Sequence, residues 1–451
     1  MIREELRSSR RAMSNVAANP ALRRIFLAFA GSLIGDGVFA LSAAVYAYRT
    51  GGATAVGLLA VARYVAIATV APFGSTLADH YSRRRVMIGS DLVRLALVLV
   101  AAFLVAAHAS KWYVYLLVIG VGVAGTAFRP AQAAILPSLS RNPDELAGSN
   151  VVSSTIESVG FFAGPAVAGF LLAYANIATA YVFDAATFIW SVLFVATVTP
   201  LAAQDQSPAM TALLPSSTRA GIAEPFLTRA MQGFRAIHGD RDVQSLVDLY
   251  ILQCVVAGAS AVFTVAIALR LLHIGTSGLG LMESTLGVGG LIGGFIALML
   301  MPRARLATHF GFGVMVWAAP LLIIAAVPNL GAALVTMWLI GAANSLVDVN
   351  AITVLQHVVP NDTLGRVLGA LEAGEVAGMA AGSLAMTVLI HVTGLREGLA
   401  LIGAVITLAV VPGLPAMKRI DARAFADGVS HRPASAHAHL HHHTLRIRHT
   451  R

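Results

Sequence analysis

The sequence predicts an all-α integral membrane protein whose twelve transmembrane helices form two bundles of six. Of its 451 residues, 57% are hydrophobic and only 12% are charged, and the mean hydropathy is +0.77. Soluble domains carry about 25% charged residues, so a chain this apolar requires the bilayer as its solvent. The lipid bilayer is therefore the first partner that the composition predicts.

Apolar stretches long enough to span a bilayer, about 20 residues each, recur along the chain. A polar stretch rich in Pro and Ser separates six of them from six more, so the layout is six helices, a linker and six helices. The expected spans are, in order, residues 22–48, 53–79, 85–108, 112–139, 146–174, 176–200, 244–271, 277–301, 306–328, 331–359, 364–392 and 396–415.

The chain is expected to divide into five segments. Within the linker, residues 225–238 have the apolar spacing of an amphipathic helix on the membrane surface. The tail is rich in histidine, a common metal ligand, but it has no fixed scaffold and we expect no specific metal site. The segments are a cytosolic N-terminal segment, a six-helix bundle, a cytosolic linker, a second six-helix bundle and a disordered cytosolic tail, at residues 1–21, 22–200, 201–243, 244–415 and 416–451.

Basic residues are distributed unevenly between the two sides of the predicted helices. Segments on the side of the N-terminus hold most of the 31 Lys and Arg residues. By the positive-inside rule both termini lie in the cytosol, which predicts a multi-pass protein of the inner or plasma membrane. The net charge of +9 then reflects anionic lipid headgroups, and nucleic acid is not an expected partner. The opposite loops hold Arg49, Lys111, Arg270 and Arg396.

The predicted loop between the second and third spans is unusually charged. Residues 74–85 read GSTLADHYSRRR, which resembles the G-x-L-A-D-R-x-G-R-R signature loop of the major facilitator superfamily. Ser75, His80 and Ser82 depart from that pattern. The resemblance implies a charge clamp that joins neighbouring helix ends in one transport state and releases them in the other. The residues assigned to this loop are Gly74, Asp79, Arg83, Arg84 and Arg85, with Arg366 in the matching loop of the second half.

A second motif lies in the fifth span. Residues 160–169 read GFFAGPAVAG and resemble the G-x-x-x-G-P-x-x-G-G motif of superfamily antiporters, in Gly160, Gly164, Pro165 and Gly169. Small residues let helices approach closely in lipid, and proline permits a bend. A packing motif with no bearing on transport direction is the alternative interpretation. Residues 128–131 (FRPA) and 365–367 (GRV) further resemble the subgroup of enterobactin and macrolide exporters.

Ionisable residues inside the first six spans are candidates for proton coupling, because charge in hydrocarbon is costly. Asp36 and Arg63 lie at similar depth in the first two spans, so we expect them to meet near mid-membrane. A pair that separates between transport states is a proton switch, and a static ion pair is the alternative. Glu157 is a second candidate. Asp184 is a third candidate, for which a packing or hydrogen-bonded role is favoured. For Arg94 a local pair with Asp91 is favoured.

The second half contributes two further polar groups. Glu372 and Glu375 share one helix face and could bind a proton or a cationic substrate, or Glu372 could pair with the arginines of the signature loop. Asn344, Asp348 and Asn350 form a polar patch that we expect to line the substrate cavity.

These features predict a secondary active transporter with protons and a small molecule as its ligands. We expect a monomer that exports a small amphipathic organic molecule, a drug or a siderophore-like compound, in exchange for protons by alternating access. Alternatives are an importer of a small nutrient and, in another class, a membrane sensor or scaffold. The sequence contains no G-x-x-x-x-G-K-[ST] loop for ATP and no nucleophile–histidine–acid set. We therefore expect no enzyme activity and no cofactor.

Overall fold

The computed structural model describes residues 16, 18–198, 234–300, 305–359 and 361–430, and these residues form helices and connecting loops without a strand. In chain order the helices are α2 (Pro20–His80), α3 (Arg83–Ala106), α4 (Lys111–Gly125), α5 (Phe128–Leu139), α6 (Pro143–Tyr174), α7 (Ile177–Ala196), α10 (Arg241–Ala266), η3 (Ile267–Leu271), α11 (Gly275–Leu300), α12 (Leu306–Ala318), α13 (Leu321–Ala326), α14 (Leu330–Val358), α15 (Asn361–Val392), α16 (Leu395–Val410), η5 (Val411–Gly413) and α17 (Leu414–Ser430).

Helix α2 is two helices joined by a break at Gly51 and Gly52. Gly51 has extended φ, and Gly52 has φ of 65° and ψ of −164°, a conformation that favours glycine because it has no Cβ. The apolar part of α2 alone has 52 residues, which at the helical rise would be about 78 Å long. The hydrocarbon core of a bilayer is only about 30 Å thick. The break therefore falls where the expected first span ends and the second begins.

The described residues contain eleven helical segments that are long and apolar enough to cross a membrane, with α2 counted once. Many large apolar side chains on these helices are exposed, such as Phe103, Leu116, Phe170 and Leu193. Exposed apolar surface of this extent is stable in lipid rather than in water. The protein is therefore a multi-pass membrane protein.

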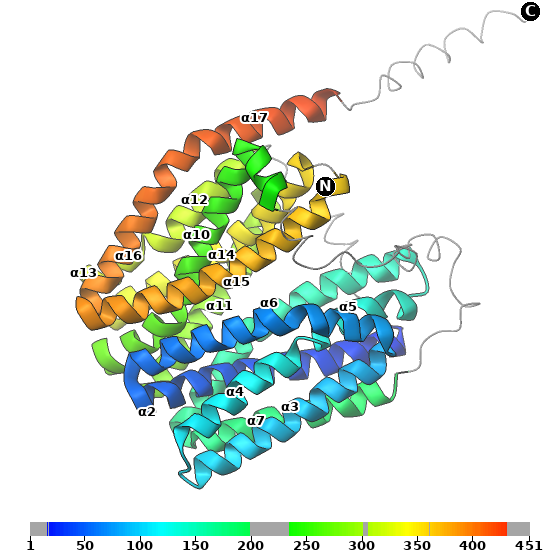
Figure 1. Ribbon diagram of the computed structural model, residues 1–451, viewed down its shortest axis with the longest axis vertical. Helices are drawn as coiled ribbons and strands as arrows, with labels where there is room; N and C mark the ends of the chain where they lie inside the picture. Colours follow the sequence, from blue (N-terminus) through cyan, green and yellow to red (C-terminus); the bar gives the residue numbers. More distant parts are fainter. Residues whose placement is uncertain (1–15, 17, 199–233, 301–304, 360, 431–451) are drawn as a thin grey trace, which may run out of the picture.

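The helices form two bundles, one from α2 to α7 and one from α10 to α17 (Figure 1). In the first bundle, α2 packs on α6 and α7, and α3 packs on α7 and α4. In the second, α10 packs on α15, and α14 packs on α11 and α12. The bundles contact each other through α6 with α11, and through α2 with α15 and α10.

Close contacts between the bundles occur near the end where α6 stops and α11 starts, which we call the closed end. There the Thr276 hydroxyl donates to the carbonyl of Leu172 at 3.1 Å. A Cβ on Gly169 would lie 2.7 Å from the Cα of Gly280, so these two helices touch backbone to backbone. Small residues permit such contacts in lipid, where close van der Waals packing drives helix association.

The prediction of a disordered tail is wrong for residues 416–430, because these residues are helical and belong to α17. Asp421 of α17 accepts hydrogen bonds from the backbone N–H of Ala307 (2.9 Å) and of Thr308 (3.0 Å) at the start of α12. Arg419 and Arg423 form ion pairs with Asp242 at the start of α10. These contacts join α17 to the N-terminal ends of α12 and α10 and hold it in place. The histidines of the tail lie outside the described residues.

The expected amphipathic helix of the linker lies partly outside the described residues. Residues 234–239 are helical. Phe234 is exposed, whereas Ile237 is buried and packs in the same apolar cluster as Val243 and Leu246 of α10. This short described part of the linker therefore packs on the second bundle.

Candidate functional site

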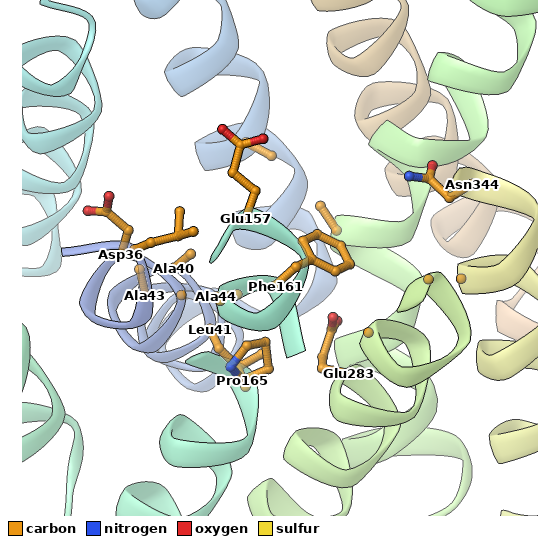
Figure 2. Close-up of a pocket in the computed structure, with 18 of the residues that line it drawn as sticks. Asp36, Ala40, Leu41, Ala43, Ala44, Glu157, Phe161, Pro165, Glu283 and Asn344 are labelled. Carbon is orange, nitrogen blue, oxygen red and sulfur yellow. The ribbon is translucent and has the colours of Figure 1, made fainter. Parts of the chain in front are cut away.

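A cavity of about 640 Å³ lies between the two bundles. Helices α2, α4, α5 and α6 line one wall, and α10, α11 and α14 line the other. Figure 2 shows the side chains of Asp36 and Glu157 from the first bundle and those of Glu283 and Asn344 from the second. The lining also contains apolar groups such as Leu41 and Phe161. A concave site with an apolar lining and a few polar groups is typical of small-molecule sites.

Asp36 lies in the cavity wall and is bound by an arginine of another helix. Arg94 of α3 donates to both oxygens of its carboxylate, at 3.2 and 3.3 Å. The Asp36 side chain is 42% exposed, whereas the Arg94 side chain is only 4% exposed. The carboxylate of Asp36 is thus accessible from the cavity and is bound by a buried cation.

Arg94 is the centre of a buried group of charges. It pairs with Asp91 one helical turn away, as expected, and its guanidinium also lies over the rings of Phe128 and Phe188, at 5.0 and 4.4 Å. Asp91 in turn accepts a hydrogen bond from Ser191 of α7 at 2.6 Å. Residues of four helices, α2, α3, α5 and α7, therefore meet at one guanidinium.

Asp184 of α7 adds a third carboxylate to this group. It is fully buried and is close enough to Asp36, Asp91 and Arg94 for their charges to interact. Its Oδ1 lies 3.4 Å from the hydroxyl of Thr187, and its Oδ2 is buried without a hydrogen-bond partner. The packing or hydrogen-bonded role expected for Asp184 does not account for its position beside two other acids.

The expected contact between Asp36 and Arg63 is wrong in this conformation, because Asp36 is bound by Arg94. Arg63 lines the cavity, as does Asp36, and both also border a side pocket of about 150 Å³ that reaches Arg94. The Nε of Arg63 is buried without a hydrogen-bond partner. Depth along a helix fixes how close two groups can come, but the rotation of each helix decides which group faces which.

Glu157 of α6 forms an ion pair with Arg129 of α5 at 3.1 Å. Both side chains are exposed and both line the cavity. Exposed ion pairs contribute about 0–1 kcal/mol, so this pair can open at little cost. Its partner Arg129 is not among the site residues predicted from the sequence.

The polar patch of α14 faces two ways. Asn344 and Asp348 line the cavity, as expected, whereas Asn350 is buried and donates to the carbonyl of Leu346. Asn344 joins three helices: its Oδ1 accepts from Gln253 of α10 (2.9 Å) and Trp317 of α12 (3.1 Å).

Asp348 completes this network. It accepts a hydrogen bond of 3.0 Å from the Nδ2 of Asn344, and Tyr250 of α10 lies beside the same carboxylate. The network fixes the orientation of the Asn344 amide, since its oxygen accepts two bonds while its nitrogen donates to an acid.

Glu283 of α11 lines the cavity but was missed in the sequence. Figure 2 shows its carboxylate pointing into the space between the bundles. The signal was available, because Glu283 is the one charged residue between Gly275 and Leu300. Charge inside a spanning helix is costly and is by default a sign of function.

Glu372 and Glu375 of α15 do not line the cavity described above. Glu372 is exposed. Among the described residues it forms no ion pair with the arginines of the signature loop, Arg83, Arg84 and Arg85. Glu375 is close enough to Asp348 for their charges to interact. A role for these two glutamates in proton or substrate binding stays a prediction.

The signature loop binds the end of another helix. The Arg84 guanidinium donates to the carbonyls of Val195 (3.2 Å) and Ala196 at the C-terminus of α7, and Arg24 donates to Thr197 at 2.7 Å. Cations at this position bind carbonyls that lack helical partners and complement the helix dipole. The side chains of Gly74 and Asp79 lie outside those described, so the charge clamp, with Arg366, stays a prediction.

The glycines of the antiporter-like motif provide close packing for α6. A Cβ on Gly164 would lie 2.9 Å from the Cα of Gly37 in α2, and one on Gly160 would lie 2.5 Å from Leu33. Gly169 contacts Gly280 of the other bundle. One face of the motif thus packs within the first bundle, and its last glycine packs across the closed end.

The family model described as Major Facilitator Superfamily matches residues 25–322. A search of curated proteins gives no match.

Solved structures of several transporters share the fold. A mutant of the nucleoside transporter NupG has a TM-score of 0.71 at 12% identity, covering 88% of this chain and 100% of its own. A POT family transporter in complex with 5-aminolevulinic acid has a TM-score of 0.68 at 12% identity, covering 88% and 96%. A bacterial homologue of the human lysosomal transporter Spinster, inward-facing and unoccupied, has a TM-score of 0.63 at 16% identity, covering 91% and 94%.

Proposed function

Because the chain belongs to the major facilitator superfamily, we propose that it is a secondary active transporter that exports a small amphipathic organic molecule in exchange for protons. The proposed substrate class is a drug or a siderophore-like compound. It rests on the resemblance of residues 128–131 and 365–367 to enterobactin and macrolide exporters. The outward direction rests on the antiporter-like motif of residues 160–169.

Twelve crossings and cytosolic termini are part of this proposal. Counting the two parts of α2 separately raises the eleven candidate spans to twelve, because α2 breaks at Gly51 and Gly52. The distribution of Lys and Arg supports termini in the cytosol and a location in the inner or plasma membrane. In this orientation the closed end faces outward, and the substrate enters the cavity from the cytosol.

One observation carries the proton coupling: the single guanidinium of Arg94 pairs with Asp36 and Asp91, and Asp184 is close enough for its charge to interact with theirs. Three ionised carboxylates and one cation would leave two uncompensated negative charges in a setting where charge is costly. Protons supply the missing positive charge. Asp36 is the member that the cavity reaches, so we propose that it takes up and releases the transported proton.

Alternating access requires contacts between the bundles that can open. The contacts of Thr276 with Leu172 and of Gly169 with Gly280 close one end in this conformation. They consist of one hydrogen bond and close backbone packing, so opening them breaks no buried ion pair. We propose that the bundles rock about the cavity, as in other transporters built from two related halves.

Two measurements test the proposal in sequence. The first profiles metabolites and drugs in cells with and without the protein, and the proposal predicts that cells without it accumulate a defined set of compounds. The second reconstitutes the protein in proteoliposomes and measures movement of those compounds under an imposed pH gradient. Net uptake by cells that make the protein would identify an importer instead, and no difference between the two cell types would contradict transport of any profiled compound.

A further inference from the structure

The charged residues on the cavity wall divide into paired and unpaired groups. Asp36 pairs with Arg94, and Glu157 pairs with Arg129. Asp348 is held by Asn344. Two charged lining residues have no recorded ion pair or hydrogen bond within the described part of the chain: Arg63 and Glu283.

Arg63 presents an unpaired cation on the wall of the first bundle. It lies about 16 Å along α2 from the break at Gly52. A Cβ on Gly122 of α4 would lie 3.1 Å from the Nε of Arg63, so glycine at this position leaves space for the guanidinium. That Nε is buried without a hydrogen-bond partner. A guanidinium on the cavity wall that has no acidic partner among the described residues is suited to bind a carboxylate or another planar anion.

Glu283 presents an unpaired acid on the wall of the second bundle. It lies about 12 Å along α11 from its start at Gly275, close to the depth of Arg63 measured from the same closed end. Gly287 and Gly290, one and two turns further along α11, line the cavity beside it. The described lining of the second bundle contains no basic residue, so the ionisable side chains of this wall are the two acids Glu283 and Asp348.

We propose that the substrate is a zwitterion whose anionic group binds Arg63 and whose cationic group binds Glu283. The juxtaposition of an unpaired cation on one bundle and an unpaired acid on the other, at similar depth, supports this substrate class. The inference rests on the proposed transport function, because it assigns the ligand of the same cavity. Apolar lining residues such as Leu41, Phe161 and Leu291 favour an apolar body between the two charged ends.

A zwitterion also explains why the two charges lie on different bundles. A ligand that bridges Arg63 and Glu283 contacts both halves at once, so binding favours conformations that bring the two walls together. A ligand with one charged group contacts one half only and leaves the other charge unpaired in a low-dielectric site. The cavity therefore selects for both groups in one molecule.

The test measures binding, which needs no transport. Purified full-length protein is mixed with ω-amino acids of increasing aliphatic or aromatic length, and thermal stabilisation reports the affinity. Each amino acid is compared with its methyl ester, which keeps only the cation, and with its N-acetyl form, which keeps only the anion. At one or more lengths the zwitterion is expected to bind about ten- to a hundredfold more tightly than either derivative.

Two substitutions assign the ends. Arg63→Gln is expected to remove the advantage of the amino acid over its ester, and Glu283→Gln its advantage over the N-acetyl form. Arg49→Gln and Glu397→Gln are matched controls, since both residues lie outside the cavity lining, and they are expected to keep both advantages. If Arg63→Gln or Glu283→Gln fails to fold, Gly122→Ala displaces the guanidinium and Glu283→Asp retracts the acid, and each is expected to weaken zwitterion binding.

The inference is overturned if no zwitterion binds better than its two derivatives, or if the preference survives both substitutions. This result is separate from failure of the proposed function. Zwitterion selectivity without proton-driven movement in proteoliposomes would refute proton coupling and leave the substrate class standing. Proton-driven export of compounds that do not carry two opposite charges would support proton coupling and refute the proposed zwitterionic substrate class.

Discussion

The guanidinium of Arg94 lies 3.2 Å from the carboxylate of Asp36 and also binds Asp91, so one buried cation joins an acid on the cavity wall to an acid in the bundle interior. The link connects α2 and α3, and Ser191 extends it to α7. A change at the cavity wall, such as arrival of a proton on Asp36, alters the charge that Arg94 shares with Asp91.

Removing this cation is expected to destabilise the first bundle. Arg94→Met leaves Asp91 buried and unpaired, and loss of one partner from a buried ion pair costs about 3–5 kcal/mol. Thermal unfolding of the purified protein in detergent measures the loss. Adding Asp91→Asn to Arg94→Met is expected to recover part of the stability, because the uncompensated charge is then removed. An unchanged unfolding temperature in Arg94→Met would show that the cluster is not held by charge.

The closed end is expected to open when a side chain is introduced at the contact between Gly169 and Gly280. Gly169→Val places side-chain atoms against the backbone of Gly280, so the conformational equilibrium shifts toward states in which α6 and α11 separate. Spin labels on Trp112→Cys and Val392→Cys, in a background where the single cysteine Cys254 is serine, report the distance between the bundles.

The distance distribution is expected to move to longer values in Gly169→Val. Gly89→Val is the matched control, because a Cβ on Gly89 of α3 meets no atom within 4 Å. If both variants give the distribution of the unmodified protein, the contact of Gly169 with Gly280 does not hold the bundles together.

Asp421 is expected to stabilise the start of α12. It accepts from two backbone N–H groups that no carbonyl of the helix can bind, as an N-cap residue does. Asp421→Ala is expected to cost about 0.5–2 kcal/mol, most of it local to that helix end. Hydrogen exchange measures this at the amides of Ala307 and Thr308. Arg419→Gln, in the same helix α17, should leave those amides protected, and equal exchange in both variants would argue against the cap.

Asn344 is expected to hold the wall of the second bundle. Asn344→Leu leaves Gln253 and Trp317 without their acceptor, and unpaired buried donors cost about 1–3 kcal/mol each. Thermal unfolding should report lower stability, and the fluorescence of Trp317 should shift as its indole N–H loses its partner. Gln356→Leu on the exposed face of the same helix is the control, and a similar response in both variants would rule out the network.

Hydropathy predicted much of the fold because bilayer thickness imposes the length of each spanning helix. The predicted ends fall within a few residues of the helix ends at α3, α6 and α14. The break in α2 was also predictable, since Gly51 and Gly52 interrupt an apolar run. Helix α17 was not expected, because its order depends on contacts of Asp421 and Arg423 with other helices, which hydropathy does not describe.

The site was predictable in its residues but not in its pairs. Asp36, Arg63, Glu157, Asn344 and Asp348 all line the cavity. The predicted partner of Asp36 was wrong because the rotation of α2 and α3 about their axes turns Arg94 toward Asp36. Sequence periodicity does not predict how one helix is rotated relative to another. Glu283 could have been found by applying to residue 283 the same depth rule that selected Asp36.

The proposed proton coupling is tested most directly by Asp36→Asn in proteoliposomes. The substitution keeps the size of the side chain and removes its capacity to ionise, and Glu397→Gln serves as the control for loss of an acid elsewhere. The compound that accumulates in cells without the protein is loaded, and its movement is followed with and without an imposed pH gradient.

We expect Asp36→Asn to bind this compound and to exchange it between the two sides, while the gradient no longer drives net movement. Glu397→Gln should respond to the gradient as the unmodified protein does. Gradient-driven movement at the normal rate in Asp36→Asn would contradict the assignment of the transported proton to Asp36.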